Sequence, residues 1–274
     1  MKLLQSEKPI IMGILNVTAD SFSDGGKFLD VDAAVIHGLR MAEEGADIID
    51  VGGESTRPGA ERVEPAAQIE RILPVIERLR GQLPEHVILS IDTTRAGVAA
   101  AALDAGAGMI NDVSAGRDDP LILELAADRK VPVALMHMQG TPATMQDAPH
   151  YDDAVEEIRA FLLQRTEAAE AAGVAPGDII LDPGIGFGKT REHNLQLLAR
   201  LDRFVDSGYA VMLGTSRKRF MGAICRVDVF SELIGATCAT TALGVMAGVR
   251  LFRVHDVTAN RQAADVAWAI KNSE

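Results

Sequence analysis

The chain has 274 residues, of which 47% are hydrophobic and 24% are charged, so it is long enough to bury one large core. Its formal net charge of −12 argues against a general affinity for nucleic acid or for an anionic membrane surface. Any anionic substrate must therefore be held by locally placed arginine and lysine side chains.

Two further features of the sequence indicate a compartment. Cys225 and Cys238 are too few for a disulfide framework, and reduced thiols in a cytoplasm are the simpler interpretation. The first residues, "MKLLQSEKPIIMG", contain no apolar stretch long enough for a signal peptide, and no segment approaches the ~18 apolar residues of a membrane span. We expect a soluble, cytoplasmic protein.

Short β-branched and aliphatic segments alternate with longer amphipathic segments from end to end. The segments that predict strands span residues 10–15, 47–51, 87–92, 109–113, 131–138, 178–182, 210–214 and 251–256. Helical patterns follow each of them, including one at 65–80 that Pro74 should kink or divide and a long one at 153–172. Eight such units predict a parallel sheet closed into a (β/α)8 TIM barrel rather than an open sheet. No linker or change in composition interrupts residues 1–274, so we expect a single domain.

Polar residues occur at the end of every predicted strand, which is where active sites lie in such barrels. These residues are Asn16, Asp50, Asp92, Asn111, Asp112, His137, Asp182, Ser216, Arg217, Lys218, Arg253 and His255. Any one of them could be a helix N-cap or a turn residue, and we assign Asp50 that role. Taken together, they predict a binding site at the mouth of the barrel.

The strand-end groups, with two residues from the second long loop, divide into two chemical sets. The set suited to a flat, nitrogen-rich heterocycle is Asp92, Asn111, Asp182 and Lys218. The set suited to an anion, such as a phosphate with a metal, is Asn16, Thr56, Arg57, Arg253 and His255. An acidic protein with this concentrated basic corner is consistent with a pyrophosphate substrate.

Two predicted strand-to-helix connections, 16–30 and 52–64, are longer than usual. Both carry charged and hydroxyl side chains, and the first adds the aromatic Phe22. Such loops are either functional lids or disordered segments, and we favour a pair of lids that close over an anion.

The segment "DPGIGFGKT", residues 182–190, is similar to a phosphate-binding loop but lacks its first glycine. Gly188, Lys189 and Thr190 match the end of that pattern, whereas the required first glycine is replaced by Pro183. Because proline has no N–H to donate to a phosphate, the segment does not predict a nucleotide site.

Seven segments of the chain, in order, resemble the dihydropteroate synthase family. They are "MGILNVTADSFSDGG" (12–26), "IIDVGGESTRPGA" (48–60), "INDVSA" (110–115), "LMHMQGTPATMQ" (135–146), "LDPGIGFGKT" (181–190), "SRKRFMG" (216–222) and "RVHDV" (253–257). The resemblance extends from about Pro9 to the last helix. Ala19 departs from the proline that is usual in the family, which should loosen the first loop, and Arg219 replaces a serine found in some members.

The resemblance implies a transferase of folate biosynthesis that condenses 6-hydroxymethyl-7,8-dihydropterin pyrophosphate with 4-aminobenzoate to give 7,8-dihydropteroate and pyrophosphate. It also implies a homodimer and a Mg²⁺ ion bound at Asn16. Three residues, Lys218, Arg253 and His255, would be catalytic.

The resemblance also assigns three subsites. The pterin ring would bind to Asp92, Asn111, Met136, Asp182, Phe187, Gly214 and Lys218. The pyrophosphate would bind to Asn16, Thr56, Arg57, Arg253 and His255. The aminobenzoate would bind to Phe22, Pro58, Lys218 and Arg219. A packed core aromatic for Phe187 and a structural histidine for His255 remain alternatives at this point.

Two other functions compete with this interpretation. A pterin-binding methyltransferase barrel would share the strand-end Asp and Asn residues but would need no lid over a pyrophosphate. A catalytically silent pterin-binding paralogue should have lost anion-binding or lid residues, and the chain retains them.

Overall fold

The computed structural model describes residues 7–17, 26–55 and 62–273, and the side chains of 26–30 are not described. Eight strands form a closed parallel barrel in chain order, and β8 pairs with β1 through Leu251 and Ile10. The strands are β1 (Ile10–Asn16), β2 (Ile48–Gly52), β3 (Ile88–Asp92), β4 (Met109–Asp112), β5 (Val133–Met136), β6 (Ile179–Asp182), β7 (Ala210–Leu213) and β8 (Leu251–Val254). Each strand begins and ends within two residues of its predicted bounds.

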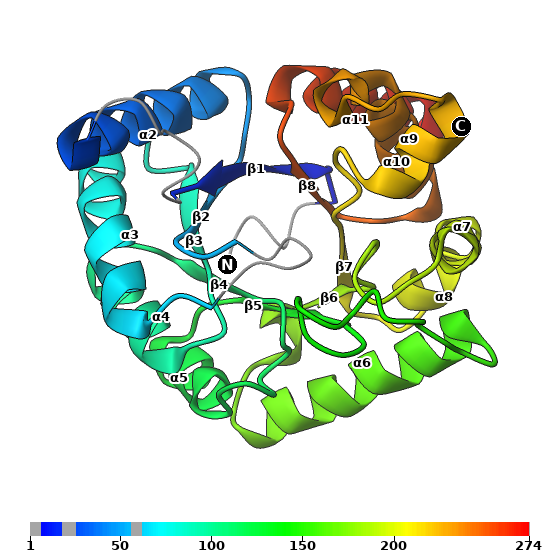
Figure 1. Ribbon diagram of the computed structural model, residues 1–274, viewed down its shortest axis with the longest axis horizontal. Helices are drawn as coiled ribbons and strands as arrows, with labels where there is room; N and C mark the ends of the chain where they lie inside the picture. The colour runs from blue at the N-terminus through cyan, green and yellow to red at the C-terminus, as the bar shows by residue number, and fades with distance from the viewer. Residues whose placement is uncertain (1–6, 18–25, 56–61, 274) are drawn as a thin grey trace.

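The helices surround the barrel as an outer ring (Figure 1). They are α2 (Gly26–Glu43), α3 (Pro65–Arg80), α4 (Ala96–Asp104), α5 (Leu121–Arg129), α6 (Ala154–Ala171), α7 (Arg191–Ala199), α8 (Asp202–Val205), α9 (Arg219–Cys225), α10 (Ile234–Ala247) and α11 (Val257–Lys271). The predicted (β/α)8 architecture is therefore confirmed. None of the described helices is both long and apolar enough to cross a bilayer.

Two local expectations were wrong: a division of the helical segment at Pro74, and the full extent of the first long loop. Helix α3 is continuous through Pro74 and is not divided there, because its apolar face (Ile72, Val75 and Ile76) is fully buried against the barrel. Helix α2 begins at Gly26, so the first long loop is shorter than the predicted 16–30.

The interior of the barrel explains why polar side chains gather at one end. Alternate strand residues point inward, and the inner apolar cluster consists of Ile10, Met12, Ile48, Met109, Ala134, Ile180, Met212 and Leu251. Two residues further along, the same face of the strands carries Asp50, Asn111, Met136, Asp182, Gly214 and Arg253. The apolar cluster thus fills the barrel up to a polar layer at the carboxyl ends of the strands.

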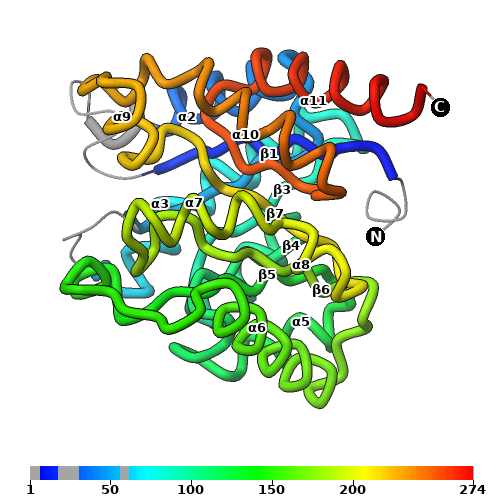
Figure 2. Tube along the Cα trace, turned by 90° about the vertical axis from the view of Figure 1, so that its right-hand side faces the viewer, coloured from blue at the N-terminus to red at the C-terminus, as the bar shows by residue number. Residues whose placement is uncertain are grey.

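The side view shows where the two ends of the barrel lie (Figure 2). The start of β1 and the end of α11 lie on the right, whereas α9 lies on the left, where the strands end. The site is therefore expected on the left-hand end of this view.

Candidate active site

A cavity of about 980 Å³ opens at the carboxyl ends of the strands. The predicted site residues that line it are Asn16, Asn111, Met136, Asp182, Phe187, Gly214, Lys218, Arg219, Arg253 and His255. Asp92 lines a neighbouring cavity of about 40 Å³ and reaches the large one through Arg253. The remaining predicted residues, Phe22, Thr56, Arg57 and Pro58, lie outside the described residues. Half of the residues of the two predicted lids lie there too, so the closure of the lids stays a prediction.

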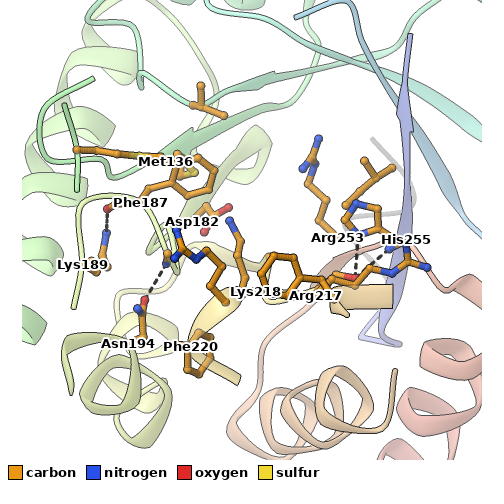
Figure 3. A pocket seen from close by; sticks show the side chains of 18 of the residues that line it. Met136, Asp182, Phe187, Lys189, Asn194, Arg217, Lys218, Phe220, Arg253 and His255 are labelled. Carbon is orange, nitrogen blue, oxygen red and sulfur yellow. Dashed lines mark hydrogen bonds between the residues drawn. The ribbon is translucent and has the colours of Figure 1, made fainter. Parts of the chain in front are cut away.

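The pocket has two chemically different sides (Figure 3). Met136, Phe187 and Lys189 lie on one side, and Arg253 and His255 lie on the other, with Lys218 between them. Arg253 and His255, two members of the predicted anion set, therefore lie together on one side of the pocket.

Arg253 is held by two buried carboxylates. Its Nε donates to Asp50 Oδ2 at 2.7 Å, and its Nη2 donates to Asp92 Oδ2 at 2.7 Å. Asp50 is fully buried inside the barrel and also accepts from Asn111 Nδ2 at 2.9 Å. The assignment of Asp50 as a helix cap was therefore wrong, since the helix after β2 begins at Pro65.

The contact with Asp50 sets the orientation of the Asn111 amide. Because Nδ2 donates to the carboxylate, the amide oxygen is the atom left to accept from a ligand in the pocket. Asp50, which lies outside the pocket, thus orients the Asn111 amide so that its oxygen can accept from a ligand.

Asp92 has a strongly perturbed acidity. Burial raises the pKa of Asp92 to about 7, the positive charge of Arg253 opposes this shift, and the negative charges of Asp50, Asp112 and Glu54 add to it. The carboxyl group therefore changes its charge close to neutral pH.

Asp182 and Lys218 form the polar centre of the heterocycle side. Asp182 Oδ1 accepts from the backbone N–H of Gly184 at 2.7 Å, and burial raises its pKa while that hydrogen bond and Lys218 oppose the shift. Burial also lowers the pKa of Lys218 to about 8, against the opposing effect of Asp182. The Lys218 ammonium lies 3.9 Å from the centre of the Phe187 ring. Phe187 lines the pocket and also packs against a buried cluster that includes Met136. It is therefore both a pocket residue and a packed aromatic, the two roles that the sequence left open.

His255 is oriented by Ser216 on the anion side. The Ser216 hydroxyl accepts from the backbone N–H of His255 at 3.1 Å and lies 3.0 Å from its Nδ1. A hydroxyl that donates to Nδ1 leaves Nε2 as the protonated nitrogen, which can donate to an anion. The neighbouring Arg217 is fixed by two contacts with Asp256, at 2.6 and 3.0 Å.

Two strand-end residues serve local structure. Asp112 accepts from the backbone N–H groups of Ser114 at 2.7 Å and Gly116 at 2.5 Å, and so holds the turn after β4. His137 is buried beneath the loop that follows β6, and it contacts Lys189 at 3.0 Å. Neither lines the large cavity.

Comparison with known proteins identifies the family. Residues 12–255 match the family described as pterin binding enzyme. Over 265 residues the chain is 48% identical to a dihydropteroate synthase from Mycobacterium leprae, which covers 94% of this chain and 92% of that protein. A dihydropteroate synthase structure from Xanthomonas albilineans with 4-aminobenzoic acid superposes with a TM-score of 0.90 at 49% identity, covering 97% of this chain and 94% of that one. A structure of the enzyme from the same organism with 7,8-dihydropteroate has a TM-score of 0.86 at 45% identity, with 97% and 94% covered.

The chain belongs to the dihydropteroate synthase family. It is accordingly a transferase of folate synthesis that produces 7,8-dihydropteroate, as its sequence segments predicted. The methyltransferase alternative has no support among these relatives.

Several residues of this dihydropteroate synthase pocket were missed by sequence reasoning. They are Ser55, Gln146, Lys189, Thr190, Arg191 and Asn194. Asn194, on α7, accepts from the backbone N–H of Gly186 at 2.7 Å and so supports the loop that carries Phe187. The available signal was the family resemblance of segments 48–60, 135–146 and 181–190, which contain Ser55, Gln146, Lys189 and Thr190.

Proposed function

We propose that the chain binds the pterin ring at Asp92, Asn111, Asp182 and Lys218 and the pyrophosphate beside Asn16, Arg253 and His255. The observation that carries this proposal is that one cavity is lined by buried hydrogen-bonding groups on one side and by basic groups on the other. A pterin edge presents two adjacent N–H donors, which suit a carboxylate, while the pyrophosphate needs cations and N–H groups.

In the proposed reaction, the amine nitrogen of 4-aminobenzoate forms a bond to the methylene carbon of the pterin. The bond from that carbon to the pyrophosphate oxygen breaks, its electron pair leaves with pyrophosphate, and one proton leaves the amine. The electron-rich dihydropterin can carry the cation that develops on its methylene carbon, so bond breaking can run ahead of bond making. Such a cation must be kept from water, which gives the long loops after β1 and β2 a role.

Arg253 and His255 would stabilise the charge that develops on the leaving pyrophosphate. The guanidinium has five N–H donors, and the contacts with Asp50 and Asp92 use two of them, so others remain for an anion. Lys218 and Arg219 would contact the aminobenzoate at the opening of the pocket.

A Mg²⁺ ion fits Asn16 only if the substrate supplies further ligands. Among the residues that the structure describes, no three His, Cys, Asp or Glu side chains are grouped to hold a metal. Mg²⁺ is commonly held by few protein oxygens together with substrate phosphates and water, and the amide oxygen of Asn16 in the cavity suits that role. When bound, the ion would supply positive charge to the pyrophosphate.

The order of binding tests this arrangement. If pyrophosphate and Mg²⁺ complete the pocket, titration calorimetry should show 4-aminobenzoate binding weakly to the free protein. Its affinity should rise at least about tenfold when a pterin, pyrophosphate and Mg²⁺ are present, the coupling usual between linked sites. Equal affinity under both conditions would refute the shared pocket.

We also propose a homodimer formed through α10 and α11, which lie side by side (Figure 1). Leu243 and Met246 on α10 are both 48% exposed, and Val266 and Ile270 on α11 are 61% and 60% exposed. Each pair lies on one face of its helix, so together they form an apolar surface that a second copy could cover. Sedimentation velocity should show a dimer that Val266→Lys dissociates and that Ile36→Lys, on the exposed surface of α2, leaves intact.

A cytoplasmic location is the last part of the proposal. Cys225 and Cys238 are both free thiols, which suits a reducing compartment. Cell fractionation should recover the protein with the cytoplasmic markers.

A further inference from the structure

Lys189, the lysine of the incomplete phosphate-loop pattern, points into the protein. Its side chain is 3% exposed, and its Nζ lies 2.9 Å from the carbonyl oxygen of Phe187. The same nitrogen lies 3.0 Å from His137 Nδ1 and 3.3 Å from the His137 carbonyl oxygen. Burial lowers the pKa of this amine well below its usual range, and the nearby charge of Asp182 opposes the shift. An amine carries at least two N–H groups in either charge state, so it can donate to acceptors on both His137 and Phe187.

The acceptors belong to two separate parts of the chain. Phe187 lies in the loop after β6, and His137 follows β5, so the amine joins the loop to the neighbouring strand end. Figure 3 shows Lys189 beside Phe187, with the hydrogen bond to the Phe187 carbonyl drawn. His137 is itself fixed, because its ring packs edge-on against Phe161 with 4.8 Å between ring centres.

The loop after β6 lies so close to the end of β5 that positions 184 and 188 have no room for a Cβ atom. A Cβ atom on Gly184 would lie 2.0 Å from the His137 carbonyl oxygen, and one on Gly188 would lie 2.6 Å from that of Gln139. Both glycines have positive φ, +68° and +62°. Tyr151 adds a hydrogen bond of 2.8 Å from its hydroxyl to the Gly188 carbonyl. The glycines of the pattern thus allow close backbone contact rather than phosphate binding.

We propose that Lys189 is a positioning residue that clamps the loop 183–188 onto the end of β5 and thereby fixes Asp182 and Phe187 for the pterin ring. The clamp acts at both ends of the loop. Lys189 holds the carbonyl of Phe187, whose ring lines the pocket, while the backbone N–H of His137 donates to the Asp182 carbonyl at 3.0 Å. This inference rests on the proposed pterin site.

The effect of Lys189→Met on pterin affinity tests the clamp. Methionine keeps a long unbranched side chain but leaves the three acceptors without their donor. Titration calorimetry with 6-hydroxymethyl-7,8-dihydropterin should show binding weakened about tenfold, the loss of roughly one hydrogen bond. In steady-state kinetics, KM for the pterin substrate should rise by a similar factor while kcat changes by less than about twofold, as expected when uniform binding is lost.

Lys271→Met is the matched control, since Lys271 also donates to a carbonyl, that of Val245 at 3.1 Å, but far from the pocket. It should leave pterin affinity unchanged. Ethylammonium should restore part of the pterin affinity of Lys189→Ala, whereas sodium at equal ionic strength should not. If Lys189→Met does not fold, Tyr151→Phe, which removes a second tether of the same loop, should weaken pterin binding by about threefold, within the net value of one neutral hydrogen bond.

Asp182→Asn separates failure of the clamp from failure of the pterin site. Weak binding by Asp182→Asn with unchanged binding by Lys189→Met would overturn the clamp alone. Unchanged binding by both variants would overturn the clamp and the proposed pterin site together.

Discussion

Arg253 and Asp92 form an ion pair at the large cavity, with 2.7 Å between Nη2 and the Oδ2 of the buried carboxylate. Asp50 binds the same guanidinium through Nε. The arginine proposed to meet the pyrophosphate is therefore fixed in position before any substrate arrives, and its orientation depends on two carboxylates.

The ion pair predicts a pH dependence of pterin binding. Burial raises the pKa of Asp92 to about 7, so the carboxylate that accepts hydrogen bonds is lost as the pH falls through that value. The groups that surround it are Arg253, which opposes the shift, and Asp50, Asp112 and Glu54, which add to it. Affinity for 6-hydroxymethyl-7,8-dihydropterin should fall between pH 8 and pH 6, by about tenfold for each unit below the pKa. The same titrations on Asp92→Asn should show weak binding without this step, and a flat profile in the unchanged protein would contradict the role of Asp92.

Removal of the Asp50 carboxylate should destabilise the fold. Asp50→Ala leaves Arg253 with a single buried partner and frees the Asn111 amide. Loss of one partner of a buried pair costs about 3–5 kcal/mol, and we expect the lower end because Asp92 remains. Urea denaturation measures this change in the free energy of unfolding. Glu44→Ala, which breaks the exposed pair with Arg40, is the control and should cost less than about 1 kcal/mol. Equal costs for the two variants would contradict the account of Asp50.

Asp182→Asn should cost about 2–4 kcal/mol of pterin binding, and a weakening of roughly a hundredfold lies near the middle of that range. The backbone N–H of Gly184 needs an acceptor, so the oxygen of the new amide should stay at that contact. The NH₂ group then faces the N–H donors of the pterin edge. Calorimetry with the pterin and with pyrophosphate alone measures the two subsites, and pyrophosphate affinity should barely change. A silent substitution would show that Asp182 only holds the turn, since asparagine also accepts that hydrogen bond.

Turnover should require Mg²⁺ and should stop in excess chelator. Asn16→Ala should raise the Mg²⁺ concentration for half-maximal rate roughly tenfold or more, because the protein loses an oxygen ligand. Asn272→Ala, at the far end of α11, is the control and should leave the Mg²⁺ dependence unchanged. Full turnover in excess chelator would show that the reaction does not need Mg²⁺.

The fold could be predicted because each strand is a short, largely apolar segment that lies between helical patterns. The pocket residues could be found for a related reason: a polar side chain two positions after an inward apolar residue lies at the barrel mouth, as with Asp182 after Ile180. Asp50 follows Ile48 by the same rule, but an aspartate near a strand end also suits a helix cap, and residue type alone does not separate the two.

Lys189 could not be placed from sequence because its partners are distant or buried. His137 lies 52 residues earlier, and only the closed barrel brings β5 beside β6. The glycines followed by lysine are similar to a phosphate-binding loop that Pro183 excludes, and the sequence assigned Lys189 no other role. The positive φ angles at Gly184 and Gly188 turn the loop back onto the protein, and packing thus decides what Lys189 contacts.

Product formation from both substrates tests the central claim most directly, which is that one barrel pocket joins the dihydropterin to 4-aminobenzoate. Purified protein should be incubated with 6-hydroxymethyl-7,8-dihydropterin pyrophosphate, 4-aminobenzoate and Mg²⁺, and pyrophosphate and 7,8-dihydropteroate should be measured together. We expect the two products in equal amounts, no dihydropteroate without aminobenzoate, and strongly reduced formation by Asp182→Asn. Pyrophosphate release at an unchanged rate without aminobenzoate, or no dihydropteroate from folded protein with both substrates, would contradict the account.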